Sequence, residues 1–176
     1  MSMPSEHPAQ SAASRRWRGR ARVAQAMALI TVTGAAQKVV PMTRWSRVIG
    51  EHSEVPTKWE AAPDQPVPVR SADLDEERVR RAIRRASERL PWTPSCLAQA
   101  AAGQIMLRRR GKPGVVVIGL RPADGEWDAH AWLLGARGAL TGGQAAEGFT
   151  PTTVFEVPDG LKASDVDLSE PTPHHA

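Results

Sequence analysis

The chain has one cysteine among its 176 residues, no tyrosine and only two phenylalanines. A single cysteine excludes an intramolecular disulfide, so Cys96 is either a small buried hydrophobe or a reactive thiol. The sequence also lacks an apolar run of the roughly 20 residues that a membrane-spanning helix needs. Its longest apolar stretch, residues 23–36, is interrupted by Gln25 and by threonines. We therefore expect no membrane span and a cytoplasmic location.

Arginine supplies most of the positive charge, which is formally +4 with a pI near 10.0. The arginines concentrate in three runs, at residues 15–22, 78–89 and 108–112. Such runs bind phosphate backbones or acidic peptides, or they form solvated helix faces. Trp17 is the one aromatic residue within them, whereas proteins that bind single strands interleave several. We expect solvated helix faces and no nucleic-acid partner. Arg15 and Arg16, followed by an apolar stretch, resemble a signal peptide, but the amphipathic pattern beyond them favours a retained helix.

The length suits one domain with appended segments, and the composition, 41% hydrophobic and 24% charged, is ordinary for a globular protein. Residues 15–50 are predicted to be helical, because apolar residues recur at helical spacing. Residues 51–72 contain four prolines without periodicity and are interpreted as a linker. The main domain is expected at residues 73–157, between a disordered start (1–14) and a disordered tail (158–176).

The main domain is predicted to be α+β. Asp73 followed by Glu76 indicates the start of one helix, and Ser95 is a suitable N-cap for a second helix that begins at Cys96. After Gly111 the pattern changes to strands, namely a continuous apolar run at 114–120 and an alternating segment at 128–134. Alternation places His130 and Trp132 on one face of that strand.

Cys96 and His130 have the placement that a thiol nucleophile and its general base require. A helix N-terminus stabilises a thiolate and lowers the thiol pKa, while an imidazole on a facing strand can accept the proton. Either residue alone is more often structural. Their order along the chain, a cysteine at a helix start and then a histidine in a sheet, favours a papain-like arrangement. The backbone N–H of Cys96 would meet the oxyanion.

Four segments around these residues carry a family resemblance. They are SCLAQA (95–100), LRRRGKP (107–113), VVVIGLR (115–121) and AHAWL (129–133). Together they resemble the lasso-peptide leader peptidases, or B proteins, which are cysteine proteases with a transglutaminase-like, papain-like core. In this core a helix bearing the cysteine packs on an antiparallel sheet bearing the histidine. The resemblance covers about residues 73–157, and the N-terminal helical segment is also similar.

The resemblance implies a function and partners. Such peptidases cleave a ribosomally made precursor between leader and core, and a separate asparagine-synthetase-like cyclase then closes the macrolactam on the freed amine. Residues 1–72 show no three-stranded recognition domain, so the resemblance implies a stand-alone peptidase with a separate leader-recognition protein. It implies no metal and no cofactor.

The strand after His130 departs from the family pattern, which places an aspartate there. Here residues 139–143 read ALTGG, with no acid. Asp128, two residues before His130, is our candidate third catalytic residue. Glu147 in the following loop is an alternative, and so is an uncharged group such as Thr141 or a backbone carbonyl.

Three further residues are predicted to bind substrate. Trp92 would form the floor of the peptide-binding site. Gln99 lies one helical turn after Cys96, and Trp132 lies on the same strand face as His130. Each could instead be an ordinary solvated or core residue.

The missing acid leaves a second function open, namely a non-catalytic scaffold that binds the precursor. Transfer of the acyl group to an amine rather than to water, as in a transglutaminase, is another.

Overall fold

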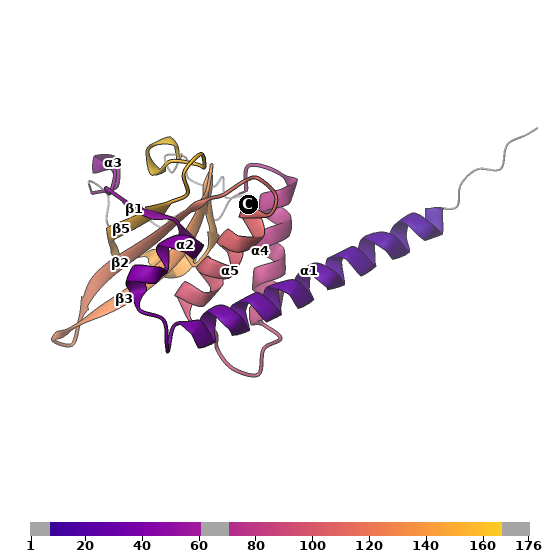
Figure 1. Ribbon diagram of the computed structural model, residues 1–176, viewed down its shortest axis with the longest axis horizontal. Helices are drawn as coiled ribbons and strands as arrows, with labels where there is room; N and C mark the ends of the chain where they lie inside the picture. Colours follow the sequence, from indigo (N-terminus) through magenta and orange to yellow (C-terminus); the bar gives the residue numbers. More distant parts are fainter. Residues whose placement is uncertain (1–7, 61–70, 167–176) are drawn as a thin grey trace, which may run out of the picture.

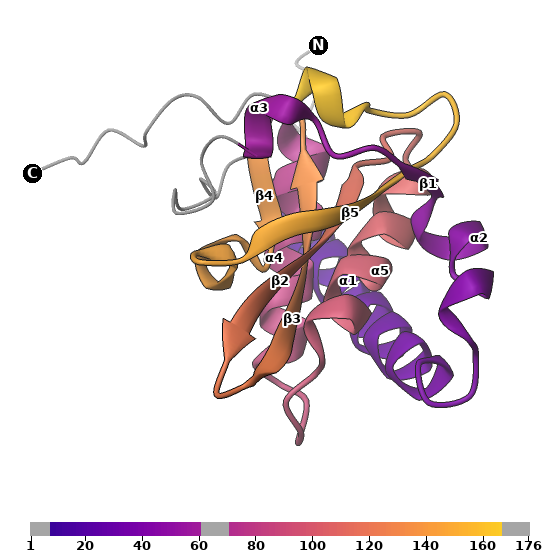
Figure 2. The same ribbon diagram turned by 90° about the vertical axis from the view of Figure 1, so that its left-hand side faces the viewer.

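The structure is a computed structural model that describes residues 8–60 and 71–166. It is α+β, as predicted: a five-stranded antiparallel sheet packs against helices (Figures 1 and 2). In sheet order the strands are β1 (Glu51–Ser53), β5 (Thr150–Glu156), β2 (Val115–Ala123), β3 (Glu126–Gly135) and β4 (Gly138–Thr141). The helices are α1 (Pro8–Ala36), α2 (Ser46–Ile49), α3 (Thr57–Glu60), α4 (Leu74–Ser87) and α5 (Cys96–Arg108), with 3-10 turns η1 (Met42–Arg44), η2 (Gly143–Ala146) and η3 (Ala163–Asp165).

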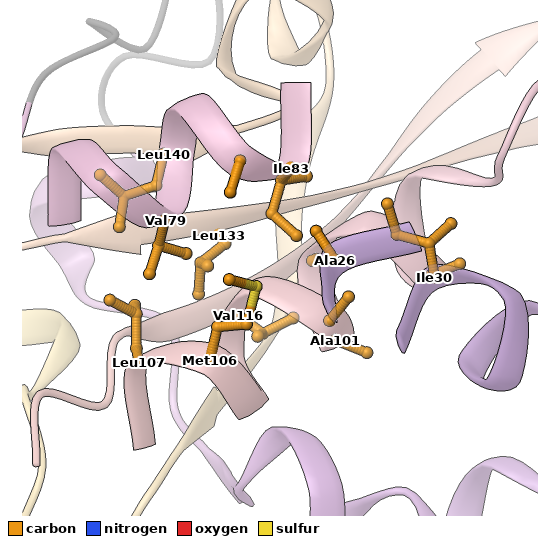
Figure 3. Close-up of a cluster of buried hydrophobic side chains, with 14 of the residues drawn as sticks. Ala26, Ile30, Val79, Ile83, Ala101, Met106, Leu107, Val116, Leu133 and Leu140 are labelled. Carbon is orange, nitrogen blue, oxygen red and sulfur yellow. The ribbon is translucent and has the colours of Figure 1, made fainter. Parts of the chain in front are cut away.

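Helices α4 and α5 lie between the sheet and α1 (Figure 1). The apolar run predicted as a buried strand is β2, which lies at the centre of the sheet with Val115, Val116 and Val117 fully buried. One face of the sheet packs against the helices through a cluster that includes Ile83, Met106, Val116 and Leu133 (Figure 3). The other face carries Trp132 and is covered by residues of α3, η2, η3 and their neighbouring loops.

Polar side chains fix where α4 and α5 begin and how they pack. Asp73 Oδ1 accepts hydrogen bonds from the backbone N–H groups of Asp75 and Glu76, as expected of an N-cap. Ser95 Oγ caps α5 by accepting from the N–H of Ala98 at 3.2 Å. Within α5, the fully buried Gln104 donates to the Gly114 carbonyl at 2.8 Å and accepts from the Gly114 N–H at 2.9 Å. These two bonds fasten α5 to the start of β2.

The predicted domain limits need three corrections. Residues 8–14, expected to be disordered, extend α1, while residues 1–7 lie outside the described residues. Residues 51–53, expected to be linker, pair with β5 as strand β1, and Trp59 of α3 is buried, whereas residues 61–70 are not described. Residues 158–166 pack through Ala163 and Val166 instead of forming a disordered tail, and 167–176 lie outside the description. Short elements that depend on tertiary pairing leave no periodic signal.

Candidate active site

Cys96 is the first residue of α5 and its side chain is half-buried. The Ser95 cap fixes the start of this helix, so the thiol lies where the backbone N–H groups of the first turn have no carbonyl partner within the helix. The backbone N–H groups of Leu97 and of Ala131 on β3 face the sulfur, and both lower the pKa of Cys96. Both contacts favour the thiolate, and the one from Leu97 is the contribution of the helix start, the smallest of the causes that lower the pKa of Cys96.

His130 lies on β3 beside the Cys96 thiol, and the interaction between the two side chains shifts the pKa values of both. Strand β4 pairs only with the last three residues of β3, Leu133 to Gly135, so it leaves the edge of β3 at His130 uncovered. The N-terminus of α5 packs against this uncovered part of β3. The two chemically active residues predicted from the sequence are therefore in contact.

The pKa values of Cys96 and His130 move toward a thiolate–imidazolium pair. Burial opposes ionisation of the Cys96 thiol, but the hydrogen bond to His130 and the N–H groups around the sulfur outweigh it and lower the pKa of Cys96. Burial also disfavours the His130 imidazolium, yet hydrogen bonds to Cys96 and to the Gly142 carbonyl raise the pKa of His130 above its ordinary value. Each residue stabilises the charged form of the other.

The carbonyl of Gly142 orients the imidazole. His130 Nε2 lies 2.9 Å from this oxygen. A carbonyl only accepts, so Nε2 carries a proton and Nδ1 is left for the thiol. Gly142 has φ of +74°, and a Cβ there would lie 2.8 Å from the Ala131 carbonyl oxygen and 3.1 Å from His130 Nε2. Glycine is thus required both by the backbone conformation and by the closeness of the imidazole.

No hydrogen bond joins Asp128 to His130, so its role as third catalytic residue stays a prediction. Its carboxylate accepts a hydrogen bond from Arg121 at 2.8 Å, across the β2–β3 register in which these residues are partners. It raises the pKa of His130 only by charge, as the smallest of the causes. The alternative Glu147 is exposed, and the Thr141 hydroxyl is buried without a hydrogen-bond partner. The group that contacts the imidazole nitrogen Nε2 is the uncharged Gly142 carbonyl.

Aromatic rings enclose the imidazole. Trp132 stacks on it with centroids 5.9 Å apart and an interplanar angle of 21°, and Phe149 packs against it at 5.3 Å. Trp132 is only 2% exposed, so the prediction that it contacts substrate is wrong and its indole shields the imidazole instead. The indole fits because Gly119 of β2 lacks a side chain, whose Cβ would lie 2.8 Å from it.

Phe149 was not foreseen from the sequence. It follows η2 in a segment without periodicity, and its only signal is that it is one of two phenylalanines in the chain. The Arg121 guanidinium lies over the Phe149 ring at 4.2 Å. Phe149 therefore links the imidazole to the charged residues of β2 and β3.

One pocket is lined by His130, and another by the loop that precedes Cys96. The first, of about 770 Å³, is lined by Arg121, Asp128, Ala129, His130, Gln144, Ala145, Glu147, Gly148 and Phe149. The second, of about 470 Å³, follows the loop before Cys96 and is lined by residues 87–88, 90–94 and Gln99. Trp92 is 49% exposed there, while Gln99 uses its side-chain amide to donate to the Pro94 carbonyl at 3.1 Å. The indole of Trp92 remains accessible to a substrate, whereas Gln99 stabilises the loop before Cys96 through its hydrogen bond to Pro94.

The C-terminal half of α1 positions the first turn of α5, a role that the sequence did not reveal. Thr33 Oγ1 lies 3.1 Å from the carbonyl oxygen of Ala98 and 2.8 Å from that of Leu29 in its own helix, so its hydroxyl bridges α1 and α5. Ser95 Oγ donates to Gln37 Oε1 at 2.8 Å, while the Gln37 amide nitrogen is buried without a hydrogen-bond partner. Residues some 60 positions apart thus hold the helix that carries the nucleophile.

Comparison with known proteins identifies the family. A family model for the transglutaminase-like superfamily matches residues 36–154, so the chain belongs to that superfamily, which includes cysteine peptidases and acyltransferases. No curated protein and no solved structure matches the chain. Across residues 8–60 and 71–166, no helix is long and apolar enough to cross a membrane. The same residues contain no cluster of three metal-ligating side chains of His, Cys, Asp or Glu.

Proposed function

We propose that the protein is a cysteine peptidase that removes the leader from a lasso-peptide precursor and frees the N-terminus of the core for cyclisation. The observation that carries the proposed peptidase activity is that Cys96 and His130 lie side by side, each shifting the pKa of the other, with the imidazole held by Gly142. A thiol in such a pair is a nucleophile near neutral pH. The sequence segments around the pair support the choice of a lasso-peptide precursor as substrate. They also support a separate recognition protein and a cyclase as partners.

The pair supports hydrolysis through an acyl-enzyme. The Cys96 thiolate attacks the carbonyl carbon of the scissile peptide bond, and the oxyanion faces the N–H groups at the start of α5. His130, as imidazolium, then gives its proton to the leaving amine, so the C–N bond breaks and a thioester remains. His130 next takes a proton from water. The hydroxide attacks the thioester, which releases the leader carboxylate and restores the thiol.

The Gly142 carbonyl performs only part of the role of an acid. It fixes the tautomer and orientation of the imidazole, which a carboxylate also does in related sites. It stabilises the imidazolium less than a full negative charge would. We expect a working dyad, with the two rings and the carbonyl replacing the orientation that an acid provides.

Cys96→Ala tests the activity. The full chain is incubated with a lasso-peptide precursor and its leader-recognition protein, and products are read by mass spectrometry in water enriched in heavy oxygen. We expect the leader product to carry the heavy label, and the alanine variant to form no product. Full cleavage by Cys96→Ala would refute the proposal. A product that carries an added amine would mean acyl transfer, and binding without cleavage by the unmodified chain would mean a scaffold.

A further inference from the structure

Arginines from separate parts of the chain converge on a cleft between α1 and α4. This arginine cleft has a volume of about 940 Å³. Its lining consists of Arg15, Arg16, Arg18, Gly19, Arg20, Arg22, Val23, Leu74, Glu77, Arg78, Arg81, Ala82, Arg85 and Arg89. The first two arginine runs of the sequence are thus one surface. No residue of α5 or of the sheet lines it, so it is separate from the pockets beside Cys96 and His130.

Most of this charge is not neutralised within the molecule. Arg78 pairs with Asp75, and Arg81 pairs with Glu77, the only acid in the lining. Hydrogen bonding to Arg80 lowers the pKa of Glu77 to about 2, so this carboxylate is ionised and already paired with arginines of its own helix. The remaining arginines of the lining form no ion pair with any carboxylate that the structure describes; they are Arg15, Arg16, Arg18, Arg20, Arg22, Arg85 and Arg89.

The arginines also repel one another. Burial lowers the pKa of Arg22, and the nearby charges of Arg78, Arg110 and Arg18 lower it further. Arg110 belongs to the third arginine run, so all three runs contribute to one positive field. Bringing like charges together costs free energy, and an anionic partner bound between them would reduce this repulsion.

Apolar side chains lie among the arginines. Val23 and Ala82 line the cleft and are buried, while Leu74 also lines it and is 70% exposed. A phosphate backbone has no apolar groups to place there, and no aromatic ring lines the cleft for stacking with bases. An amphipathic helix with acidic residues beside an apolar stripe matches both features, since such helices bind in grooves through residues spaced three and four apart.

We propose that the arginine cleft is a docking site for an acidic, amphipathic segment of a partner protein. The proposal does not depend on the chemistry of Cys96. If the protein acts on a precursor delivered by a separate recognition protein, this cleft is a surface by which such a complex could form.

Binding of designed probes to the full chain tests the docking site. Three labelled probes are compared by fluorescence anisotropy: a helical peptide with glutamates beside a leucine stripe, a peptide of scrambled order, and a single-stranded oligonucleotide of equal charge. The cleft variant is Arg16→Glu with Arg85→Glu, one residue from each helix. The control is Arg44→Glu with Arg137→Glu, both exposed and outside the cleft. Either pair lowers the net charge by four.

We expect the amphipathic peptide to bind the unmodified chain more tightly than the other probes, and the cleft variant to lose about tenfold or more in affinity. The control should lose less than about threefold. Equal losses in both variants, or equal binding of the scrambled peptide, would overturn the proposal. So would tighter binding of the oligonucleotide, which would indicate a nucleic-acid site. Thermal melting of both variants, and unchanged alkylation of Cys96, separate a failure here from a failure of the peptidase hypothesis.

Discussion

The two halves of α1 have opposite surroundings. In the C-terminal half, Ala26, Ile30 and Thr33 are buried, and Thr33 and Gln37 hydrogen-bond to the first turn of α5 and its cap. In the N-terminal half, residues 14–18 are all exposed, and this end projects away from the domain (Figure 1). The C-terminal half of α1 is fixed by packing, whereas the N-terminal half exposes charged side chains to solvent.

This difference separates two requirements of the protein. A nucleophile works only when its helix is held to within a fraction of an ångström, which needs burial and satisfied hydrogen bonds. A docking surface needs the reverse, because charges already paired within the molecule have little to offer a partner. Substitutions near Cys96 should therefore alter catalysis, whereas those in the arginine cleft should alter binding alone.

The largest effect is expected from His130→Ala. Loss of the general base should reduce precursor cleavage by about 10²–10⁴-fold, because neither the thiol nor the leaving amine then has a proton partner. Affinity for the amphipathic peptide at the arginine cleft should stay the same. Cleavage within about tenfold of the unmodified chain would show that His130 is not the base.

Gly142→Ala should give the next largest effect, since the new Cβ collides with the Ala131 carbonyl and with the imidazole. We expect destabilisation of about 1–3 kcal/mol and slower alkylation of Cys96. Gly148→Ala is the matched control, because Gly148 also has a positive φ, +76°, but only Arg121 Cδ lies near its Cβ position, at 3.8 Å. Equal loss of Cys96 reactivity in both variants would mean that the Gly142 carbonyl does not orient the imidazole.

Thr33→Val sharpens the comparison within α1. It removes the hydroxyl that bridges α1 and the Ala98 carbonyl, so we expect a loss of about 1 kcal/mol in the free energy of unfolding and a moderate drop in Cys96 reactivity. Thr31→Val is the control, because the Thr31 hydroxyl is exposed and bonds only within its own helix, to the Met27 carbonyl. Chemical denaturation and alkylation rates measure both effects. If the two valine variants behave alike, α1 does not position α5 through this bond.

Asp128→Asn should have the smallest effect. It breaks an exposed ion pair with Arg121, and such pairs contribute about 0–1 kcal/mol. Precursor cleavage should stay within about threefold of the unmodified chain, because the Gly142 carbonyl holds the imidazole. A loss of about 100-fold or more would support Asp128 as the third catalytic residue.

Local features of the sequence predicted much of the site. Ser95 before Cys96 indicated a capped helix, and the alternation around His130 indicated a strand; both depend on neighbouring residues. An unspecified backbone carbonyl was only one alternative among several, and Gly142 was not named, because backbone groups are the same at every residue of a sequence. Phe149, Thr33 and Gln37 were missed since they reach the site through tertiary packing. The convergence of the arginine runs was missed for the same reason, as each run alone resembles a solvated helix face.

The most direct test of the account is the pH dependence of Cys96 alkylation by iodoacetamide. Cys96 is the only cysteine in the chain, so the full-length protein reports on this thiol alone. We expect the midpoint to lie well below the value of about 8.5 of a free thiol, and to move up toward that value in His130→Ala. A midpoint near 8.5 in the unmodified chain, unchanged in His130→Ala, would contradict the proposed thiolate–imidazolium pair.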